Sequence, residues 1–508
     1  MNSRHQFFLV CIFSIVISIS FFSCKKSQEV VEQLPEPQIV AGIAKIHGKL
    51  NDPKQQVTSL ILRFRNPVTA SESIIEAPVE KDGSFYFETP IECSVVFGSI
   101  YFPGYRGVLF ELFPDEDKNI ELGLDYSGKL IINNANGNSL LTDQDKKSYE
   151  AVLGKYFDFF LGKQDYNPKM TPKEYEEYEI IRMKDRTDNA MKGAKLSDAG
   201  KKFVLNELKL IQARTLIHYK EGAELLFMNS KNKEKSENWS PPDPDIQYYS
   251  FLKSFDLNNP QYIFNSYYSK IIQSLLTTKA FDIPLIADTP VEEWLSNVKA
   301  ILSDLVGFEK GQFYDLLAAN SYSMQFNDDV IPLSDKQKNN IKAYFGDGEI
   351  AKILLRKNEE IIKLAGQKSA VVVNKTPDVS KEKLMDAIVS KYKNKVVLVD
   401  FWATWCGPCL DAMTRIDAIK SRLKDKGVVF VYVTNGSSPK ELWDKKINSI
   451  PGEHYYVNAD EWEYLMKNFG FKYIPSYVIF DSKGAVRHKF TAFPGIETIK
   501  IAIEELLP

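Results

Sequence analysis

Short alternating runs of apolar and polar residues, separated by turn residues, fill the chain from about Gln38 to Asn133. A period of two is typical of strands that bury one face. We expect strands at Ile39–Leu50, Val57–Arg65, Ser84–Glu88, Val95–Phe102, Gly107–Phe113 and Ile120–Leu124. Lys81-Asp82-Gly83 predicts a hairpin. The pattern therefore predicts an N-terminal antiparallel β-sandwich domain over residues 38–135. No His, Asp or Glu cluster in it has the spacing of a metal site.

Helical periodicity replaces the strand pattern between Leu140 and Lys368. Val204, Leu205, Leu208 and Ile211, for example, fall on one face of a helix. We expect a central all-α domain over residues 136–370. No internal repeat of about 20 to 50 residues is present, and the pattern of this region does not indicate a function.

Strands alternate with helices in the last quarter of the chain. After a predicted linker at Ala370–Asp378, Val396–Phe401 and Val428–Thr434 read as strands buried on both faces. The helix between them carries one apolar face formed by Ala412, Ile416, Ile419 and Leu423. We expect further helices at Pro439–Ile447, Asp460–Phe469 and Ile496–Leu507, and a hairpin from Tyr477–Phe480 and Ala485–Phe490. This order predicts a C-terminal α/β domain around a mainly parallel sheet, over residues 376–508.

The first residues have the pattern of a targeting signal. Arg4 supplies positive charge, Phe7–Phe22 is an apolar run broken by serines, and Ser23 and Cys24 follow. The run is short for a membrane-spanning helix. Phe21–Cys24 resembles a bacterial lipobox, which implies a signal peptide over residues 1–23, lipidation of Cys24 and a tether over residues 24–37. The resemblance implies a lipid-anchored protein of the cell envelope that faces the periplasm. A plain signal peptide is the alternative.

Composition and charge are those of an ordinary folded chain. The 508 residues are 44% hydrophobic and 26% charged, and the formal net charge is −3. These values exclude collagen-like, wholly disordered and polytopic membrane proteins. A chain near neutrality lacks the positive charge that nucleic-acid binding needs.

The cysteines point to redox chemistry rather than to a disulfide framework. Of five cysteines, Cys11 lies in the predicted signal, Cys24 is the predicted lipidation site, and Cys93 lies in an apolar stretch that predicts a buried thiol. Only Cys406 and Cys409 can form a local pair. In an exported chain stabilised by large cores, such a pair is more typical of chemistry than of structure.

Trp405-Cys406-Gly407-Pro408-Cys409 lies between a buried strand and the start of an amphipathic helix. The free backbone N–H groups and the helix dipole favour a thiolate on the first sulfur. We expect Cys406 to be the nucleophile and Cys409, nearly one turn further on, to resolve the mixed disulfide. Pro408 is tolerated because a first-turn N–H has no helical partner.

The segment Val399–Cys409, with Asp400, Trp402 and Cys-Gly-Pro-Cys in place, resembles the thioredoxin superfamily and within it the TlpA/ResA-like thiol–disulfide oxidoreductases. Tyr473-Ile474-Pro475-Ser476, with Pro475 lying 69 residues after Cys406, resembles the family's cis-proline turn. The resemblance implies a cis Ile474–Pro475 bond beside which an extended substrate pairs, and a buried Asp400 that assists proton transfer at Cys409. Trp405, Gly407 and Pro408 are the implied supporting residues.

The family also implies the partners: disulfide-containing exported proteins as substrates and a membrane electron donor for recycling. No bound cofactor is required. The chain departs from the family at Ala412 and Thr414, where TlpA-like proteins have Glu and Pro, and Asp411 is offset by about 100° around the helix from the position of that Glu. Val428–Thr434 also lacks the Lys that thioredoxin pairs with its buried Asp.

Other interpretations of the pair stay open at this point. A zinc half-site needs two further ligands, which neither His454 nor His488 supplies by spacing. An inert structural disulfide, a thiol peroxidase, and a ligand-binding or scaffold lipoprotein with a vestigial thioredoxin-like domain are the remaining alternatives. The Gly-Pro dipeptide between the cysteines is that of thioredoxin, so we expect a reductase or isomerase of exported proteins. A measured reduction potential would decide between reductase, isomerase and oxidant. The membrane, the leaflet and the oligomeric state are not indicated.

Overall fold

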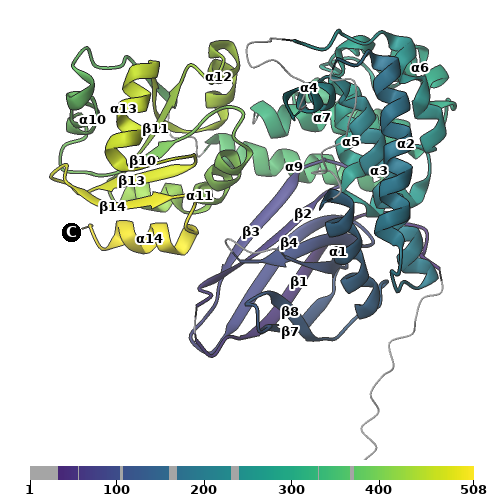
Figure 1. Ribbon diagram of the computed structural model, residues 1–508, viewed down its shortest axis with the longest axis horizontal. Coiled ribbons are helices and arrows are strands. Elements are labelled where there is room, and N and C mark those ends of the chain that lie inside the picture. Colours follow the sequence, from purple (N-terminus) through teal and green to yellow (C-terminus); the bar gives the residue numbers. More distant parts are fainter. Residues whose placement is uncertain are drawn as a thin grey trace, which may run out of the picture.

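The computed structural model describes residues 33–54, 56–102, 107–158, 169–229, 239–329, 331–366 and 371–507. Two β-sheets, a group of helices and a C-terminal mixed sheet with helices on both faces follow one another along the chain (Figure 1). The predicted fold class is therefore confirmed. Cys24 and most of the predicted tether lie outside the described residues, but Leu34 near its end is buried against the helices, and the Nε2–H of Gln261 donates to the carbonyl of Pro35 at 2.8 Å.

The N-terminal region consists of two four-stranded sheets with strand orders β4-β1-β7-β8 and β3-β2-β5-β6. Their inner faces share one apolar core, which makes them a sandwich. Pairing is antiparallel except between β1 and β7, so the all-antiparallel prediction is wrong for that pair. The strands are β1 (Ile39–Asn51), β2 (Ser59–Arg65), β3 (Glu72–Pro78), β4 (Ser84–Cys93), β5 (Val96–Tyr101), β6 (Val108–Leu112), β7 (Asp117–Leu124) and β8 (Leu130–Ala135).

The central region is helical and shares its core with the sandwich. Phe97 of β5 packs on Phe203 with ring centroids 4.3 Å apart. In the described residues no helix is both long enough and apolar enough to cross a bilayer. The α-helices are α1 (Asp143–Asp158), α2 (Pro172–Met191), α3 (Asp198–Ile217), α4 (Tyr219–Asn229), α5 (Ser266–Thr277), α6 (Val291–Val306), α7 (Gln312–Met324), α8 (Asp335–Phe345) and α9 (Glu349–Gly366). The shorter turns are η2 (Ile246–Phe255), η3 (Pro260–Phe264), η4 (Lys279–Phe281) and the π-helix η5 (Gln325–Asp329).

The C-terminal region is a six-stranded sheet of order β14-β13-β10-β11-β12-β9. The strands β9 to β12 run parallel, and β13 and β14 are antiparallel. The strands are β9 (Val371–Asn374), β10 (Val396–Phe401), β11 (Val428–Asn435), β12 (Gly452–Val457), β13 (Ser476–Phe480) and β14 (Val486–Thr491). The predicted linker at Ala370–Asp378 therefore contains an edge strand, because β9 pairs with β12.

Helices cover both faces of this sheet. On one face lie α11 (Gly407–Asp425), α12 (Lys440–Lys446) and α14 (Ile496–Glu504), and on the other lie α10 (Lys381–Ser390) and α13 (Ala459–Phe469). A 3₁₀ turn, η6 (Ile447–Ser449), follows α12. The predicted face of α11, formed by Ala412, Ile416, Ile419 and Leu423, is buried. The helix after Cys406 is thus fixed against its sheet.

The outer face of the sheet β3-β2-β5-β6 packs on α11. Leu60 and Leu62 of β2 point into the sandwich core, so Ile61 between them lies on the outer face of the sheet. Ile61 is nevertheless fully buried. Glu76 of β3, paired with Ile61 in the ladder, forms a buried ion pair with Arg415 of α11 at 2.6 Å. The N-terminal sandwich therefore contacts the helix that carries the cysteine pair. Glu76 also accepts the backbone N–H of Ile496, at the start of α14, at 3.2 Å.

Candidate active site

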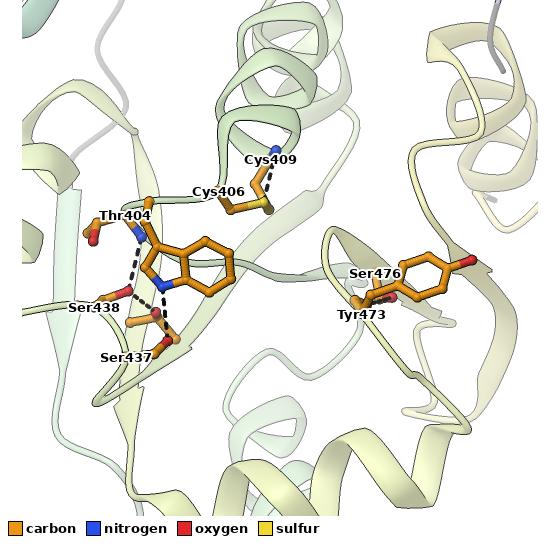
Figure 2. Close-up of a disulfide and its surroundings, with 9 residues drawn as sticks. Thr404, Cys406, Cys409, Ser437, Ser438, Tyr473 and Ser476 are labelled. Atoms are coloured by element: carbon orange, nitrogen blue, oxygen red, sulfur yellow. Dashed lines mark hydrogen bonds between the residues drawn. A yellow bond between two sulfur atoms is a disulfide. The ribbon is translucent and has the colours of Figure 1, made fainter. Parts of the chain in front are cut away.

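The cysteine pair occupies the junction between β10 and α11. The buried strand β10 ends at Phe401, a short loop follows, and α11 begins at Gly407. Cys406 and Cys409 form a disulfide with their Cα atoms 5.3 Å apart (Figure 2). The sequence places this pair at a strand-to-helix junction, and the structure brings it together there.

The backbone of the first helical turn is directed at the first sulfur. The N–H of Cys409 donates to the Sγ of Cys406 at 3.2 Å. A donor in this position, together with the positive end of the helix dipole, lowers the free energy of a thiolate on Cys406 in the reduced protein. Cys406 is 3% exposed and Cys409 fully buried, so an incoming disulfide can reach only the first sulfur.

The surface around the disulfide is open and partly aromatic. Gly407 and Pro408 are exposed, and Trp405 is 63% exposed. The indole Nε1–H of Trp405 donates to the Oγ of Ser437 at 3.3 Å, which ties the ring to the turn that follows β11. These three predicted supporting residues therefore form an accessible rim at the helix N-terminus.

The loop before β13 has the geometry that the resemblance implied. The Ile474–Pro475 peptide bond is cis. Pro475 is buried and its carbonyl accepts the N–H of Ala492 at 2.9 Å, whereas Tyr473 is 58% exposed. The hydroxyl of Ser476 donates to the carbonyl of Tyr473 at 2.8 Å and closes the turn (Figure 2).

Asp400 lies in the middle of the sheet, on the face that α11 covers. Its ladder partners are Tyr432 on β11 and Tyr477 on β13, so the three side chains lie in one row. Asp400 is 1% exposed, and neither carboxylate oxygen has a hydrogen-bond partner in the described part of the chain. Burial raises the pKa of Asp400 well above its usual range.

Lys420 supplies the cation that the neighbouring strand lacks. The absence of Lys from β11 suggested that no positive charge acts on Asp400, but the buried ammonium group of Lys420 opposes the rise in the pKa of Asp400. Its Nζ donates to the Oη of Tyr432 at 2.8 Å and lies 3.3 Å from an oxygen of Asp417. Lys420 follows Cys409 by eleven residues, so helical periodicity places both on one face of α11.

Replacing Lys420 by Met should raise the pKa of Asp400 further, because the buried carboxylate loses its favourable charge. The ionised form of Asp400 is then reached only at higher pH. If this carboxylate accepts the proton of Cys409, the rate at which Cys409 resolves a mixed disulfide depends on the ionised form of Asp400. The acid limb of the pH–rate profile, where this rate rises with pH, then moves to higher pH. A limb displaced by one pH unit lowers the rate at acidic pH about tenfold. Stopped-flow measurements over a pH series that spans this limb would detect the displacement.

The matched control for this variant is Lys426→Met. Lys426 is half-exposed, directly follows α11 and pairs with Glu504 of α14. The profile of Lys426→Met should coincide with that of the wild type. An unchanged profile in Lys420→Met would show that Lys420 does not act on the site.

Asp411 is engaged on the interdomain side of α11. Its carboxylate lies 3.9 Å from Arg415. Burial raises the pKa of Asp411, and Arg63 of β2 and Arg415 oppose that rise. The carboxylate of Asp411 therefore lies within electrostatic reach of Arg63 of the N-terminal sheet.

The other thiol and the possible metal ligands considered from the sequence do not form part of the site around Cys406 and Cys409. Cys93 is a free buried thiol, as predicted, and burial raises its pKa to about 11, which makes it a poor nucleophile. Among the described residues no group of three or more His, Cys, Asp or Glu is placed to hold a metal ion.

Comparison with known proteins gives a consistent result for the C-terminal region. The Redoxin family model matches residues 372–502. The thioredoxin of Rickettsia prowazekii is 37% identical over 78 residues, which are 14% of this chain and 73% of the relative. The thiol-disulfide oxidoreductase ResA of Geobacillus thermodenitrificans is 28% identical over 145 residues, which are 28% of this chain and 82% of the relative.

The crystal structure of the thioredoxin domain of a thiol-disulfide oxidoreductase from Bacteroides vulgatus is 21% identical, covers 23% of this chain and 84% of its own, and gives a TM-score of 0.21.

The fold and the cysteine pair define a thioredoxin-like thiol–disulfide oxidoreductase domain in the C-terminal quarter of the chain. Through this domain the chain belongs to the thioredoxin family and is related to the ResA-like oxidoreductases. The sandwich and the helical region lie outside the matched segment.

Proposed function

We propose that the protein is an exported, lipid-anchored enzyme that reduces or isomerises disulfides of extracytoplasmic proteins. The observation that carries the proposal is the N–H of Cys409 donating to the Sγ of Cys406 at the start of a helix, inside an exposed rim. A thiolate held there attacks one sulfur of a substrate disulfide, so that the substrate S–S bond breaks, a mixed disulfide with Cys406 forms, and the other substrate sulfur leaves as a thiolate and takes up a proton. Cys409 then attacks the sulfur of Cys406 in the mixed disulfide, the substrate thiolate leaves and takes up a proton, and the Cys406–Cys409 disulfide is formed.

A protein substrate fits the rim better than a small molecule does. Two aromatic rings are exposed at the site, Trp405 directly before Cys406 and Tyr473 two residues before Pro475. The carbonyl of Pro475 is already bonded to Ala492, so the main-chain groups of the preceding Ile474 are the ones left for an extended segment to pair with. Main-chain pairing of this kind binds a chain with little demand on its sequence.

Export and anchoring rest on the sequence of residues 1–24. The charged start, the apolar run and Cys24 support a signal peptide followed by a lipidated cysteine. In this position the dithiol faces the periplasm, and a membrane electron donor returns the Cys406–Cys409 disulfide to the dithiol after each turnover.

One fractionation experiment tests both parts of the proposal. Cells that express the full chain are separated into membrane and soluble fractions, and each fraction is reduced and assayed for insulin reduction. We expect the activity of the wild-type chain in the membrane fraction, and the same activity in the soluble fraction for Cys24→Ser. Equal distribution of the two chains would contradict the lipid anchor. Absence of insulin reduction from all fractions that contain the chain would contradict the redox function.

A further inference from the structure

A cavity of about 420 Å³ lies between the end of β2 and the helices α3, α5 and α7. Three cationic side chains line it, Arg65 of β2, Arg214 of α3 and Lys270 of α5, together with the amide of Gln273 and the ring of Tyr267. No Asp or Glu is among its described lining residues. The volume is that of a site for a small molecule.

Hydrogen-bond donors in this cavity are buried without acceptors. The Nε–H groups of Arg65 and Arg214 have no hydrogen-bond partner in the described part of the chain. Arg65 uses its other nitrogens on the carbonyl of Ala70 at 2.6 Å and on Glu72 at 3.5 Å. Buried donors in folded proteins are almost always paired, so the two Nε–H groups show that the described part of the chain does not use the full hydrogen-bonding capacity of these guanidinium groups.

The charges around the cavity do not balance. Burial, Arg65 and Arg214 lower the pKa of Lys270, and Glu72 and Glu207 oppose that shift without cancelling it. Burial also lowers the pKa of Arg65; Glu72 opposes this shift, whereas Arg63 and Arg214 add to it. These shifts mean that Arg65 and Lys270 are each destabilised by loss of water and by neighbouring cations.

Two carboxyl groups lie on the far side of Arg65 and Lys270, where these residues also line a second cavity of about 280 Å³. Glu72 is engaged by Arg63 at 3.0 Å. Burial raises the pKa of Glu207 to about 7, and the hydroxyl of Tyr149 donates to it at 3.3 Å. Near neutral pH, Glu207 therefore carries only part of a charge, and the cations remain in excess.

We propose that this cavity binds a small anionic molecule, whose carboxylate or phosphate group is held by Arg65, Arg214 and Lys270. Guanidinium groups match the planar or tetrahedral oxygens of such anions with two parallel hydrogen bonds. The amide of Gln273 supplies a neutral donor beside them. The site is separate from the cysteine pair, so it does not depend on the redox function proposed above.

The test is a titration of the full chain with inorganic phosphate and, in a second arm, with succinate, at constant ionic strength maintained with sodium chloride. Thermal unfolding and isothermal calorimetry follow the binding. We expect a saturable rise in Tm for at least one anion, and the anion with the lower Kd identifies the group that the site prefers.

Arg214→Gln and Lys270→Gln should each weaken this binding at least about tenfold, since each loses a charged hydrogen bond. Lys270→Arg keeps the charge and should retain most of the affinity. The matched control is Lys202→Gln, which removes an exposed cation from α3, the helix that carries Arg214, and should bind as the wild type does.

A structural role for the cations predicts a different result. If the cavity is an anion site, removing one of the cations relieves repulsion, so Arg214→Gln has an equal or higher Tm than the wild type in anion-free buffer. A lower Tm for Arg214→Gln, a rise in Tm that does not saturate, or equal affinities in the wild type and both Gln variants would each overturn the proposal.

Discussion

The Cys406→Ala variant is expected to lose disulfide reduction by at least about 1000-fold, to the uncatalysed background, because no other described thiol can attack a substrate. Cys409 is fully buried, and burial raises the pKa of Cys93 to about 11. The N-terminus of α11 would still be present, but it would have no sulfur to act on. Insulin reduction in the presence of dithiothreitol measures this loss directly.

The Cys409→Ala variant should differ in kind, because Cys406 can still attack. The mixed disulfide at Cys406 then cannot be resolved, so the variant accumulates covalent complexes with its substrates, which non-reducing gels and mass spectrometry detect. Cys93→Ala is the matched control and should keep full activity. Insulin reduction by Cys406→Ala at the wild-type rate would disprove the assignment of the nucleophile.

The C-terminal fold could be predicted because its signals are local. Val396–Phe401 and Val428–Thr434 are apolar β-rich runs, and the face of α11 shows a helical period, so each element is visible in its own residues. The cysteine pair follows from its place between them. β9 could not be predicted in this way, because four residues at a sheet edge show too little pattern and gain their order from pairing with β12.

The cation near Asp400, Lys420, could not be found by searching the neighbouring strand β11, because it lies on helix α11. In the structure Tyr432 occupies the ladder position beside Asp400, and Lys420 reaches Tyr432 from α11. The spacing of eleven residues from Cys409 was a usable signal, since it returns to the same face of α11. A Lys on the buried face of an otherwise apolar helix indicates an acidic or polar partner underneath.

Strand β3 shows the limit of reasoning from local pattern. Glu72–Pro78 is mostly half-buried, and two Glu residues interrupt its apolar positions, so the pattern does not predict a strand there. Glu76 is nevertheless 3% exposed on its side chain, because Arg415, more than 300 residues further along the chain, lies against it. A charged residue that is buried only by another domain has no signature in its own segment.

Glu76 joins three parts of the molecule. Its carboxylate accepts from Arg415 at 2.6 Å and from the backbone N–H of Ile496, the first residue of α14, at 3.2 Å, and the hydroxyl of Ser59 also donates to it. Arg415 in turn stacks over the ring of Phe493 at 4.3 Å. The contact therefore links β3 to the helix of the cysteine pair and to the start of α14, where a negative charge is favoured by the helix dipole.

Glu76→Gln should destabilise the docking of the N-terminal sheet on α11 by up to about 3–5 kcal/mol, because it leaves the guanidinium of Arg415 buried with only the more distant carboxylate of Asp411, at 3.9 Å, as a counter-charge. Hydrogen exchange of the backbone in β3 and α11 measures the loss as a drop in protection confined to these elements. The double variant Glu76→Gln with Arg415→Met should recover much of the protection, since it removes the poorly paired charge as well.

Asp444→Asn provides the control, since it breaks the exposed pair of Asp444 with Lys440 within α12 and should change protection by no more than about 0.5 kcal/mol. If protection in β3 and α11 were the same in Glu76→Gln and in the wild type, the ion pair would not hold the two parts together. If the double variant were less protected than either single variant, the loss would come from packing rather than from unpaired charge. Recovery of protection in the double variant would distinguish a charge effect from a packing effect. The second substitution, Arg415→Met, removes the poorly paired charge but does not restore lost packing.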